Sequence, residues 1–294
     1  MKLQIKNDKK YFARVAQTFF ALAAAIAFSG CFAHKEAPER LVSAKGAAEG
    51  EARAAELESL DLSGAGETSL PASLATMPRL RVLYLRGGAF TDFSALAGAK
   101  SLEVLDLARV KFDELPQEVL SLSALRDLYL SGCGLRAFPQ RLDSLPALRY
   151  LNLDRNAIDS LPDTLPPHLR WLRLNHNSIK TLPESVGALA SLERLYLRGN
   201  GLTAIPDALS RCTAVTDLDL ASNDLDSFPT VLASLPKLRN LDLSGNKRIA
   251  AMPDDTTLAK MSALRTLKLT GCPLANDERE RVRAALPDSC AIIF

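Results

Sequence analysis

The feature that most constrains the fold is a short leucine pattern that recurs along most of the chain. One copy runs from Leu148 to Leu153 (LRYLNL), continues through Asn156 and ends on the pair Leu161-Pro162. The copies are spaced by 23, 22, 23, 23, 21, 23, 23, 23 and 26 residues, and they begin at Leu57, Leu80, Leu102, Leu125, Leu148, Leu169, Leu192, Val215, Leu238 and Leu264. Such a period indicates stacked units, each of which buries its apolar face only against its neighbours. We therefore expect one elongated repeat domain.

The pattern LxxLxLxxNxLxxLPxxLxxLxx, from residue 57 to about 275, resembles the 23-residue class of bacterial leucine-rich repeat proteins. The leucine spacing alone indicates the same fold, because each LxxLxL is a short strand whose leucines point to one side. We expect an α/β repeat: a curved leucine-rich repeat solenoid with a parallel concave sheet of about ten strands and a C-terminal cap.

The chain divides into four predicted segments. Residues 1–30 form a lipoprotein signal peptide, 31–52 an acylated cysteine with a flexible tether, 53–275 the ten repeats, and 276–294 a cap. The cap consists of a helix over Asp277 to Leu286, which Asn276 or Asp277 can cap, and a strand over Ala291 to Phe294. A solenoid needs such a cover over its open apolar end.

The amino end has the organisation of an export signal. Five basic residues in the first fourteen precede an apolar run from Thr18 to Phe28, which is shorter than the roughly 20 residues of a membrane span. An uncleaved anchor over residues 15–33 stays open as an alternative.

The sequence Phe28-Ser29-Gly30-Cys31 resembles a bacterial lipobox, although Phe28 stands where leucine is usual. The resemblance implies lipidation of Cys31 and a membrane anchor. Phe32 follows the cysteine, and a residue other than aspartate there favours the outer over the inner bacterial membrane.

Asparagine occupies one position of the repeat from the fifth copy onward: Asn156, Asn177, Asn200, Asn223 and Asn246. The chain leaves its strand there, and the buried backbone groups need partners. These asparagines are predicted to form a structural ladder. The first four copies carry Ala65, Gly88, Val110 and Cys133 instead.

The residues between the strand leucines face outward from the concave sheet. Every tyrosine after residue 31 and the single tryptophan fall in the two columns beside the second leucine. Because Tyr, Trp and Arg are enriched at binding hot spots, we predict a partner-binding surface of Tyr84, Tyr129, Tyr150, Trp171, Arg173, His176, Arg194, Tyr196 and Arg198. Packing of aromatic residues across strands is the alternative interpretation. Asp217, Asp219 and Asp242 are interpreted as a solvated acidic face beside it.

Nothing in the sequence indicates catalysis or a cofactor. No phosphate loop, metal-ligand spacing or nucleophile beside His176 is present, and a net charge of +2 gives no indication of nucleic-acid binding. Of the four cysteines after Cys31, Cys133 and Cys272 take the ladder position, and Cys272 with Cys290 is the one disulfide considered.

These observations predict a non-enzymatic, membrane-anchored lipoprotein that recognises a protein partner through its concave face. Two alternatives remain. The same aromatic side chains suit a glycan or cell-wall ligand, and the amino terminus could instead direct a secreted, host-directed effector.

Overall fold

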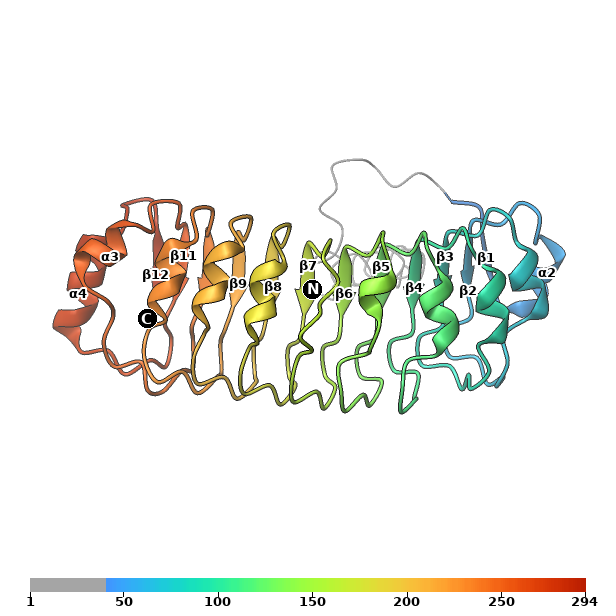
Figure 1. The fold of residues 1–294 in the computed structure, drawn as a ribbon, viewed down its shortest axis with the longest axis horizontal. Coiled ribbons are helices and arrows are strands. Elements are labelled where there is room, and N and C mark those ends of the chain that lie inside the picture. The colour runs from blue at the N-terminus through green and yellow to red at the C-terminus, as the bar shows by residue number, and fades with distance from the viewer. Residues whose placement is uncertain (1–40) are drawn as a thin grey trace, which may run out of the picture. The chain divides into compact units, whose positions relative to one another are not determined.

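The computed structural model describes residues 41–294, of which residues 42–294 form one compact unit. The predicted signal peptide, Cys31 and most of the predicted tether lie outside the described residues. In the described part, twelve three-residue strands form one open parallel sheet in chain order (Figure 1). They are β1 (Ser43–Lys45), β2 (Ser59–Asp61), β3 (Val82–Tyr84), β4 (Val104–Asp106), β5 (Asp127–Tyr129), β6 (Tyr150–Asn152), β7 (Trp171–Arg173), β8 (Arg194–Tyr196), β9 (Asp217–Asp219), β10 (Asn240–Asp242), β11 (Thr266–Lys268) and β12 (Ala291–Ile293).

The pairing register puts equivalent leucines side by side. Leu151 pairs with Leu172, and Leu172 with Leu195, so the leucines of successive repeats form one continuous apolar core. The curved leucine-rich repeat solenoid is confirmed. The sheet has two strands more than the ten repeats supply, because β1 and β12 extend it at either end.

Seven return segments on the convex side contain a 3-10 helix of three to five residues. They are η1 (Ala72–Thr76), η2 (Ser94–Gly98), η3 (Gln117–Ser121), η4 (Leu142–Ser144), η5 (Glu184–Ala188), η6 (Asp207–Arg211) and η7 (Thr230–Ser234). Proline immediately precedes five of them and cannot continue a helix backward. The 21-residue fifth repeat returns from β6 to β7 without a helix.

The predicted asparagine ladder is present. Asn223 donates to the carbonyls of Leu197 (3.0 Å) and Leu220 (2.9 Å) and accepts from the Leu202 N–H (3.1 Å). Asn156, Asn177, Asn200 and Asn246 make the corresponding bonds. At the same position the Cys133 thiol donates to the Leu107 carbonyl at 3.2 Å. A thiol replaces one donor of the amide and leaves the acceptor role unfilled.

The predicted tether boundary at residue 52 is wrong. Strand β1 pairs with β2, and the short helix α2 (Ala47–Ala52) follows it. Gly50 of this helix lies against Leu60, where an added Cβ would come within 2.8 Å of a leucine methyl carbon. Helix α2 contains no repeat leucine. Its alanine and glycine residues are small enough for the helix to lie close to the first strand and to cover part of the core.

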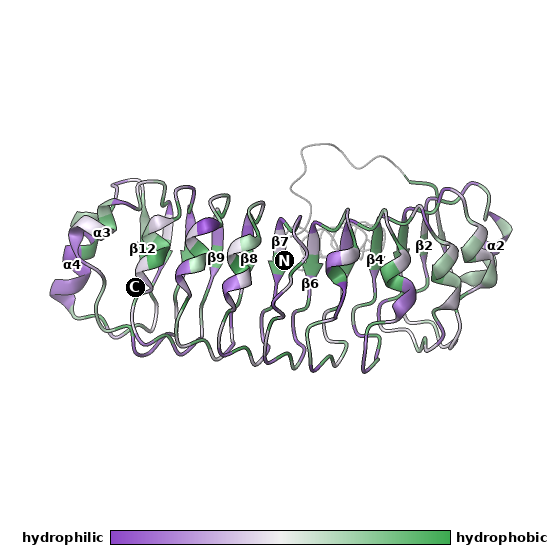
Figure 2. Ribbon diagram, viewed as in Figure 1, coloured by the Kyte–Doolittle hydropathy of each residue, from purple (hydrophilic) through white to green (hydrophobic). Residues whose placement is uncertain are grey.

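The far end is covered by α4 (Asn276–Ala285) and β12, at the predicted positions. Val282 is fully buried while the outer side of α4 is hydrophilic (Figure 2). The residue before the helix is Ala275, and neither Asn276 nor Asp277 serves as the cap. The extra residues of the ninth repeat form α3 (Asp255–Ala259), which contacts α4.

Candidate binding surface

The sheet register brings the two outward columns of neighbouring repeats together. Tyr150 pairs with Trp171, and Trp171 with Arg194. In the second column Arg173 lies between Asn152 and Tyr196. Residues that are 21 to 23 positions apart in the chain are thus adjacent on β6, β7 and β8.

Four side chains contact one another in succession from β5 to β8: Tyr129 of the second column, then Tyr150, Trp171 and Arg194 of the first column. The ring centroids of Tyr129 and Tyr150 are 4.8 Å apart, and those of Tyr150 and Trp171 are 5.7 Å apart in an edge arrangement. The guanidinium carbon of Arg194 lies 4.3 Å from the Trp171 centroid. Such aromatic and cation–π contacts favour fixed geometries. We call Tyr129, Tyr150, Trp171, Arg173, Arg194 and Tyr196 the central patch.

The arginines of this region are held by carboxylates of the sheet. Arg173 stacks over Tyr196 at 5.3 Å and pairs with Asp154 at 2.8 Å. Arg198 pairs with Asp219 at 3.0 Å and with Asp242 at 2.7 Å. Burial raises the pKa of the Tyr196 hydroxyl above its ordinary value. The patch presents cationic and aromatic groups in a fixed arrangement.

The aspartates of the second column have a structural role that the sequence did not reveal. In five repeats this side chain accepts a hydrogen bond of 2.8 to 3.0 Å from the backbone N–H two residues later; the acceptors are Asp61, Asp106, Asn152, Asp219 and Asp242. This is an Asx turn at the end of the strand. Asp242 is also buried and paired with Arg198. The interpretation of Asp242 as part of a solvated acidic face is therefore wrong.

Two repeats of the central patch satisfy the same backbone groups in another way. The N–H of Asn175 donates to Asp154 at 2.7 Å, and the N–H of Arg198 donates to the Asn175 side chain at 2.8 Å. Each acceptor comes from the preceding repeat. Because Asp154 and Asn175 accept these two hydrogen bonds, the second-column residues of these repeats need not act as acceptors. Arg173 and Tyr196 can therefore occupy that column.

The predicted residues do not all contribute exposed surface to the central patch. Tyr150 is only 5% exposed, so it supports Trp171 instead of offering surface of its own. Tyr84 lies on β3 opposite Asp61 and Asp106, outside the aromatic row. His176 is exposed in a left-handed turn (φ 56°), at the position that is glycine in most repeats. Arg198 lies at the edge of the patch.

A shallow hollow of about 330 Å³ adjoins the patch on β8 to β11. Tyr196 and Arg198 form one side, and the rest is lined by polar groups including Asp217, Asn240 and Lys268. The Asp217 carboxylate accepts from the Asn240 amide at 2.8 Å. The sequence columns contain these residues, but only the register shows that they surround one depression.

The described residues give no indication of metal or redox chemistry. Residues 41–294 contain no group of three or more His, Cys, Asp or Glu side chains that could hold a metal ion. Burial raises the pKa of the Cys133 thiol to about 12 and that of Cys212 to about 11, so both thiols stay protonated. The disulfide considered between Cys272 and Cys290 is not formed, because both are free cysteines.

Among residues 41–294, no helix has both the length and the apolar character required to cross a membrane.

Two family models match the chain. One described as a leucine-rich repeat region covers residues 165–290, and one described as leucine rich repeat covers residues 100–158. No curated protein matches the chain in sequence.

Solved structures share the fold. A leucine-rich repeat protein of Leptospira interrogans is 25% identical with a TM-score of 0.60, over 81% of this chain and 72% of that protein. An internalin of Listeria monocytogenes is 21% identical with a TM-score of 0.62, over 81% and 74%.

A third structure is the leucine-rich repeat ectodomain of the Arabidopsis thaliana receptor kinase GASSHO1/SCHENGEN3, in complex with Casparian strip integrity factor 2. It is 25% identical with a TM-score of 0.62, over 81% of this chain and 30% of that one. From its repeats, ladder and matches, the chain is a leucine-rich repeat protein. Such domains generally mediate protein–protein binding and are typically non-enzymatic scaffolds.

Proposed function

We propose that this protein is a membrane-anchored binding protein that recognises a protein partner through the central patch. The observation that carries the proposal is the stacked row from Tyr129 through Tyr150 and Trp171 to Arg194. A surface that already holds its aromatic and guanidinium groups in place loses little side-chain entropy on binding. Tyr, Trp and Arg are also the residues that contribute most to binding energy at protein interfaces.

The neighbouring contacts support the same surface. The hydrogen bonds that the Asp154 and Asn175 side chains accept fix the strand ends beneath the patch. The ion pair of Arg173 with Asp154 orients one cation. A partner would contact mainly Trp171, Arg173 and Tyr196, which are half-buried in the free protein. Tyr150 would act beneath them by supporting the indole ring.

The anchor is proposed on the sequence alone. Cys31 would carry the lipid, and the protein would be exported and held at a bacterial membrane, the outer in preference to the inner. Labelling of the producing cells with a palmitate analogue tests this: the wild type is expected to be labelled and Cys31→Ala is not. Equal labelling of the two would contradict the anchor without affecting the binding surface.

The binding surface is tested by affinity capture from the producing cells. Trp171→Ala is expected to reduce capture of a specific partner at least about tenfold, since removal of a hot-spot residue costs about 2 kcal/mol or more. Val104→Ala is the matched control, because Val104 is also half-buried and occupies the same column on β4. Equal loss in the two variants, or none in either, would contradict the proposal.

A glycan or cell-wall ligand is a second candidate, supported by the hollow beside the patch. The carboxylates and the Asn240 amide there, next to the ring of Tyr196, suit sugar hydroxyls and a sugar face. Binding of the purified protein to peptidoglycan, competed by free glycan and lost in Trp171→Ala, would favour this ligand over a protein partner.

A further inference from the structure

The residue immediately before each repeat strand belongs to a column with a charge pattern of its own. Because the strands pair in register, these residues lie side by side where the strands begin. Along the chain the column reads Glu58, Arg81, Glu103, Arg126, Arg149, Arg170, Glu193, Thr216, Arg239 and Arg265. Acid and base alternate in its first four members, and then three arginines occur in succession before β5, β6 and β7. We call Arg126, Arg149 and Arg170 the arginine row.

The backbone hydrogen bonds place the three arginines next to one another. The Arg149 N–H donates to the Arg126 carbonyl at 2.9 Å, and the Arg170 N–H donates to the Arg149 carbonyl at 2.8 Å. Neighbouring strands lie about 4.8 Å apart, and like charges at adjacent positions repel one another. The fold does not require this repulsion, because other repeats carry glutamate or threonine at the same position.

Carboxylates of the column engage the two outer arginines and leave the middle one. Arg126 pairs with Glu103 at 3.5 Å, and Glu103 is also bound by Arg81 at 2.8 Å. Arg170 pairs with Glu193. The exposed Arg149 guanidinium makes no ion pair or hydrogen bond with any side chain of residues 41–294. The arginine row therefore has an unneutralised cation at its centre.

A hollow of about 420 Å³ lies beside the row and is lined by Arg149, Arg170, Ala190, Ser191, Glu193 and Ala214. Its one carboxylate, Glu193, is already paired with Arg170. A guanidinium group binds a carboxylate through two parallel N–H donors. A carboxylate that enters the hollow can thus bind Arg149 without displacing an existing ion pair.

The opposite ends of β6 and β7 also lead to basic residues, Arg155 and His176. Both adopt the left-handed conformation, with φ of 59° and 56°, at a position that is glycine in six repeats. Residues other than glycine adopt this conformation at a cost, and they cluster at functional sites. The next repeat accommodates the His176 ring, because a Cβ on Gly199 would lie 2.7 Å from its Nδ1 atom. Basic residues thus flank Trp171 and Arg173 on both sides.

We propose that the protein partner presents a carboxylate-rich segment to the arginine row, with one carboxylate bound by Arg149 in the hollow. This inference rests on the proposed function, because it specifies the chemistry of the partner that the central patch recognises. The row spans about 10 Å, which is the length of about three extended residues. Two carboxylates in such a segment can bind Arg149 and one of its neighbours.

The test uses Trp171 as a reporter. It is the only tryptophan of the chain, and its N–H donates to the Arg149 carbonyl at 3.0 Å. The purified protein is titrated with hexaglutamate, hexaglutamine and hexalysine peptides while its fluorescence is followed. Hexaglutamate is expected to bind about tenfold more tightly than hexaglutamine, since two exposed ion pairs each contribute about threefold to fivefold. Hexalysine is expected not to bind, and added salt should weaken hexaglutamate. Equal binding of hexaglutamate and hexaglutamine would overturn the proposal.

Variants locate the binding. Arg149→Gln is expected to weaken hexaglutamate about threefold to fivefold, the contribution of one exposed ion pair. Arg239→Gln is the matched control and should have no effect, because Arg239 is equally exposed and occupies the same column before β10. Both substitutions are at exposed positions, and circular dichroism checks that the fold is kept. Equal losses in the two variants, or none in Arg149→Gln, would contradict the site.

Two further measurements separate this inference from other outcomes. Tripolyphosphate that binds more tightly than hexaglutamate, and is weakened by Arg149→Gln, would overturn the carboxylate-rich segment in favour of a phosphate-bearing ligand. Absence of hexaglutamate binding, while Trp171→Ala still reduces partner capture, would overturn this inference and leave the proposed function standing.

Discussion

The repeats from Leu57 to Ala147 and those from Leu148 to Ala263 place different side chains at the same point of the turn. The later repeats use asparagine; Asn223, for example, donates to one carbonyl of its own repeat and one of the preceding repeat, and accepts from one N–H of the preceding repeat. The earlier ones use Ala65, Gly88, Val110 and Cys133, of which Cys133 makes one such bond. The same backbone path is thus held by hydrogen bonds in one half and by apolar packing in the other.

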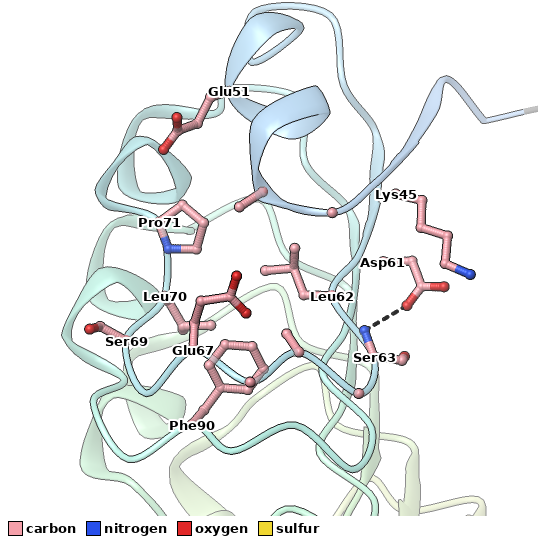
Figure 3. Close-up of a pocket in the computed structure, with 15 residues that line it drawn as sticks. Lys45, Glu51, Asp61, Leu62, Ser63, Glu67, Ser69, Leu70, Pro71 and Phe90 are labelled. Atoms are coloured by element: carbon pink, nitrogen blue, oxygen red, sulfur yellow. Dashed lines mark hydrogen bonds between the residues drawn. The ribbon is translucent and has the colours of Figure 1, made fainter.

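The difference correlates with where the central patch and a hollow at the amino-terminal end of the repeats lie. The central patch begins where the amide ladder begins, at β5 and β6, and its strand ends are fixed by the Asp154 and Asn175 side chains. The hollow between α2 and the first repeat, which Ala65 and Phe90 line (Figure 3), lies where the ladder position is alanine and glycine. Side-chain amides fix the strand ends in the later half, and small ladder residues leave space in the earlier half.

The largest expected effect comes from breaking the ladder in the later half. Asn223→Ala removes three hydrogen bonds of a fully enclosed amide that is 4% exposed. Unsatisfied buried groups cost roughly 1 to 3 kcal/mol each, so we expect the free energy of unfolding to fall by about 4 kcal/mol. Urea denaturation followed by circular dichroism measures it. A loss below about 1 kcal/mol would show that the ladder contributes little.

Alkaline pH is expected to destabilise the earlier half through Cys133. Burial raises the pKa of its thiol to about 12 from an ordinary value of 9.0, so above pH 9 the unfolded state releases a proton that the folded state keeps. Stability is therefore complete below pH 9 and falls between about pH 9 and 12. One pKa unit corresponds to about 1.4 kcal/mol, which gives a loss of about 3 kcal/mol by pH 11.

The measurement is the urea midpoint at pH 7, 9 and 11 for the wild type and Cys133→Ala. The variant should show a smaller fall with pH, because the alanine cannot ionise. Parallel curves for the two proteins would mean that Cys133 is accessible to water.

The hydrogen bonds accepted by Asp154 and Asn175 beneath the patch are a third difference between the two halves. Asp154→Ala leaves the Asn175 N–H without its acceptor and Arg173 without its ion pair. We expect a loss of about 2 kcal/mol in stability, together with weaker partner capture. Asp106→Ala in the earlier half is the control: it removes a turn of the ordinary type and should leave capture unchanged.

The smallest expected effect extends the ladder into the earlier half. Cys133→Asn puts an amide where the thiol now donates to the Leu107 carbonyl at 3.2 Å. It can add an acceptor for the backbone of the third repeat, and one net hydrogen bond contributes about 1 kcal/mol. A small rise in the thermal midpoint would confirm that asparagine can replace the cysteine at the ladder position of the earlier half. A clear fall would mean that the earlier half is packed around a smaller side chain.

The sequence predicted the fold well because the leucine spacing fixes both the strand direction and the stacking period. It also predicted the ladder and the location of Trp171 and Arg194 on one face. It failed at the amino end, where α2 has no leucine period and depends on Gly50 lying close to Leu60.

The sequence also could not distinguish the two kinds of residue in the outward columns. Asp242 and Tyr196 occupy equivalent positions in their repeats. Asp242 accepts the hydrogen bond that closes its own turn, whereas in the repeat of Tyr196 a side chain of the preceding repeat, Asn175, accepts that hydrogen bond. The burial of Tyr150 likewise depends on rings from neighbouring repeats, 21 residues away in either direction. These are relations between repeats, which a pattern within one repeat does not contain.

The most direct test of the central claim is photo-crosslinking in the producing cell, with a photoreactive amino acid at Trp171 and, as control, at the exposed Gln117 of the convex helix η3. Adducts are identified by mass spectrometry. Recognition through the central patch predicts a distinct protein adduct from position 171 and none from position 117. Equal adducts from both positions, or none from position 171, would contradict it.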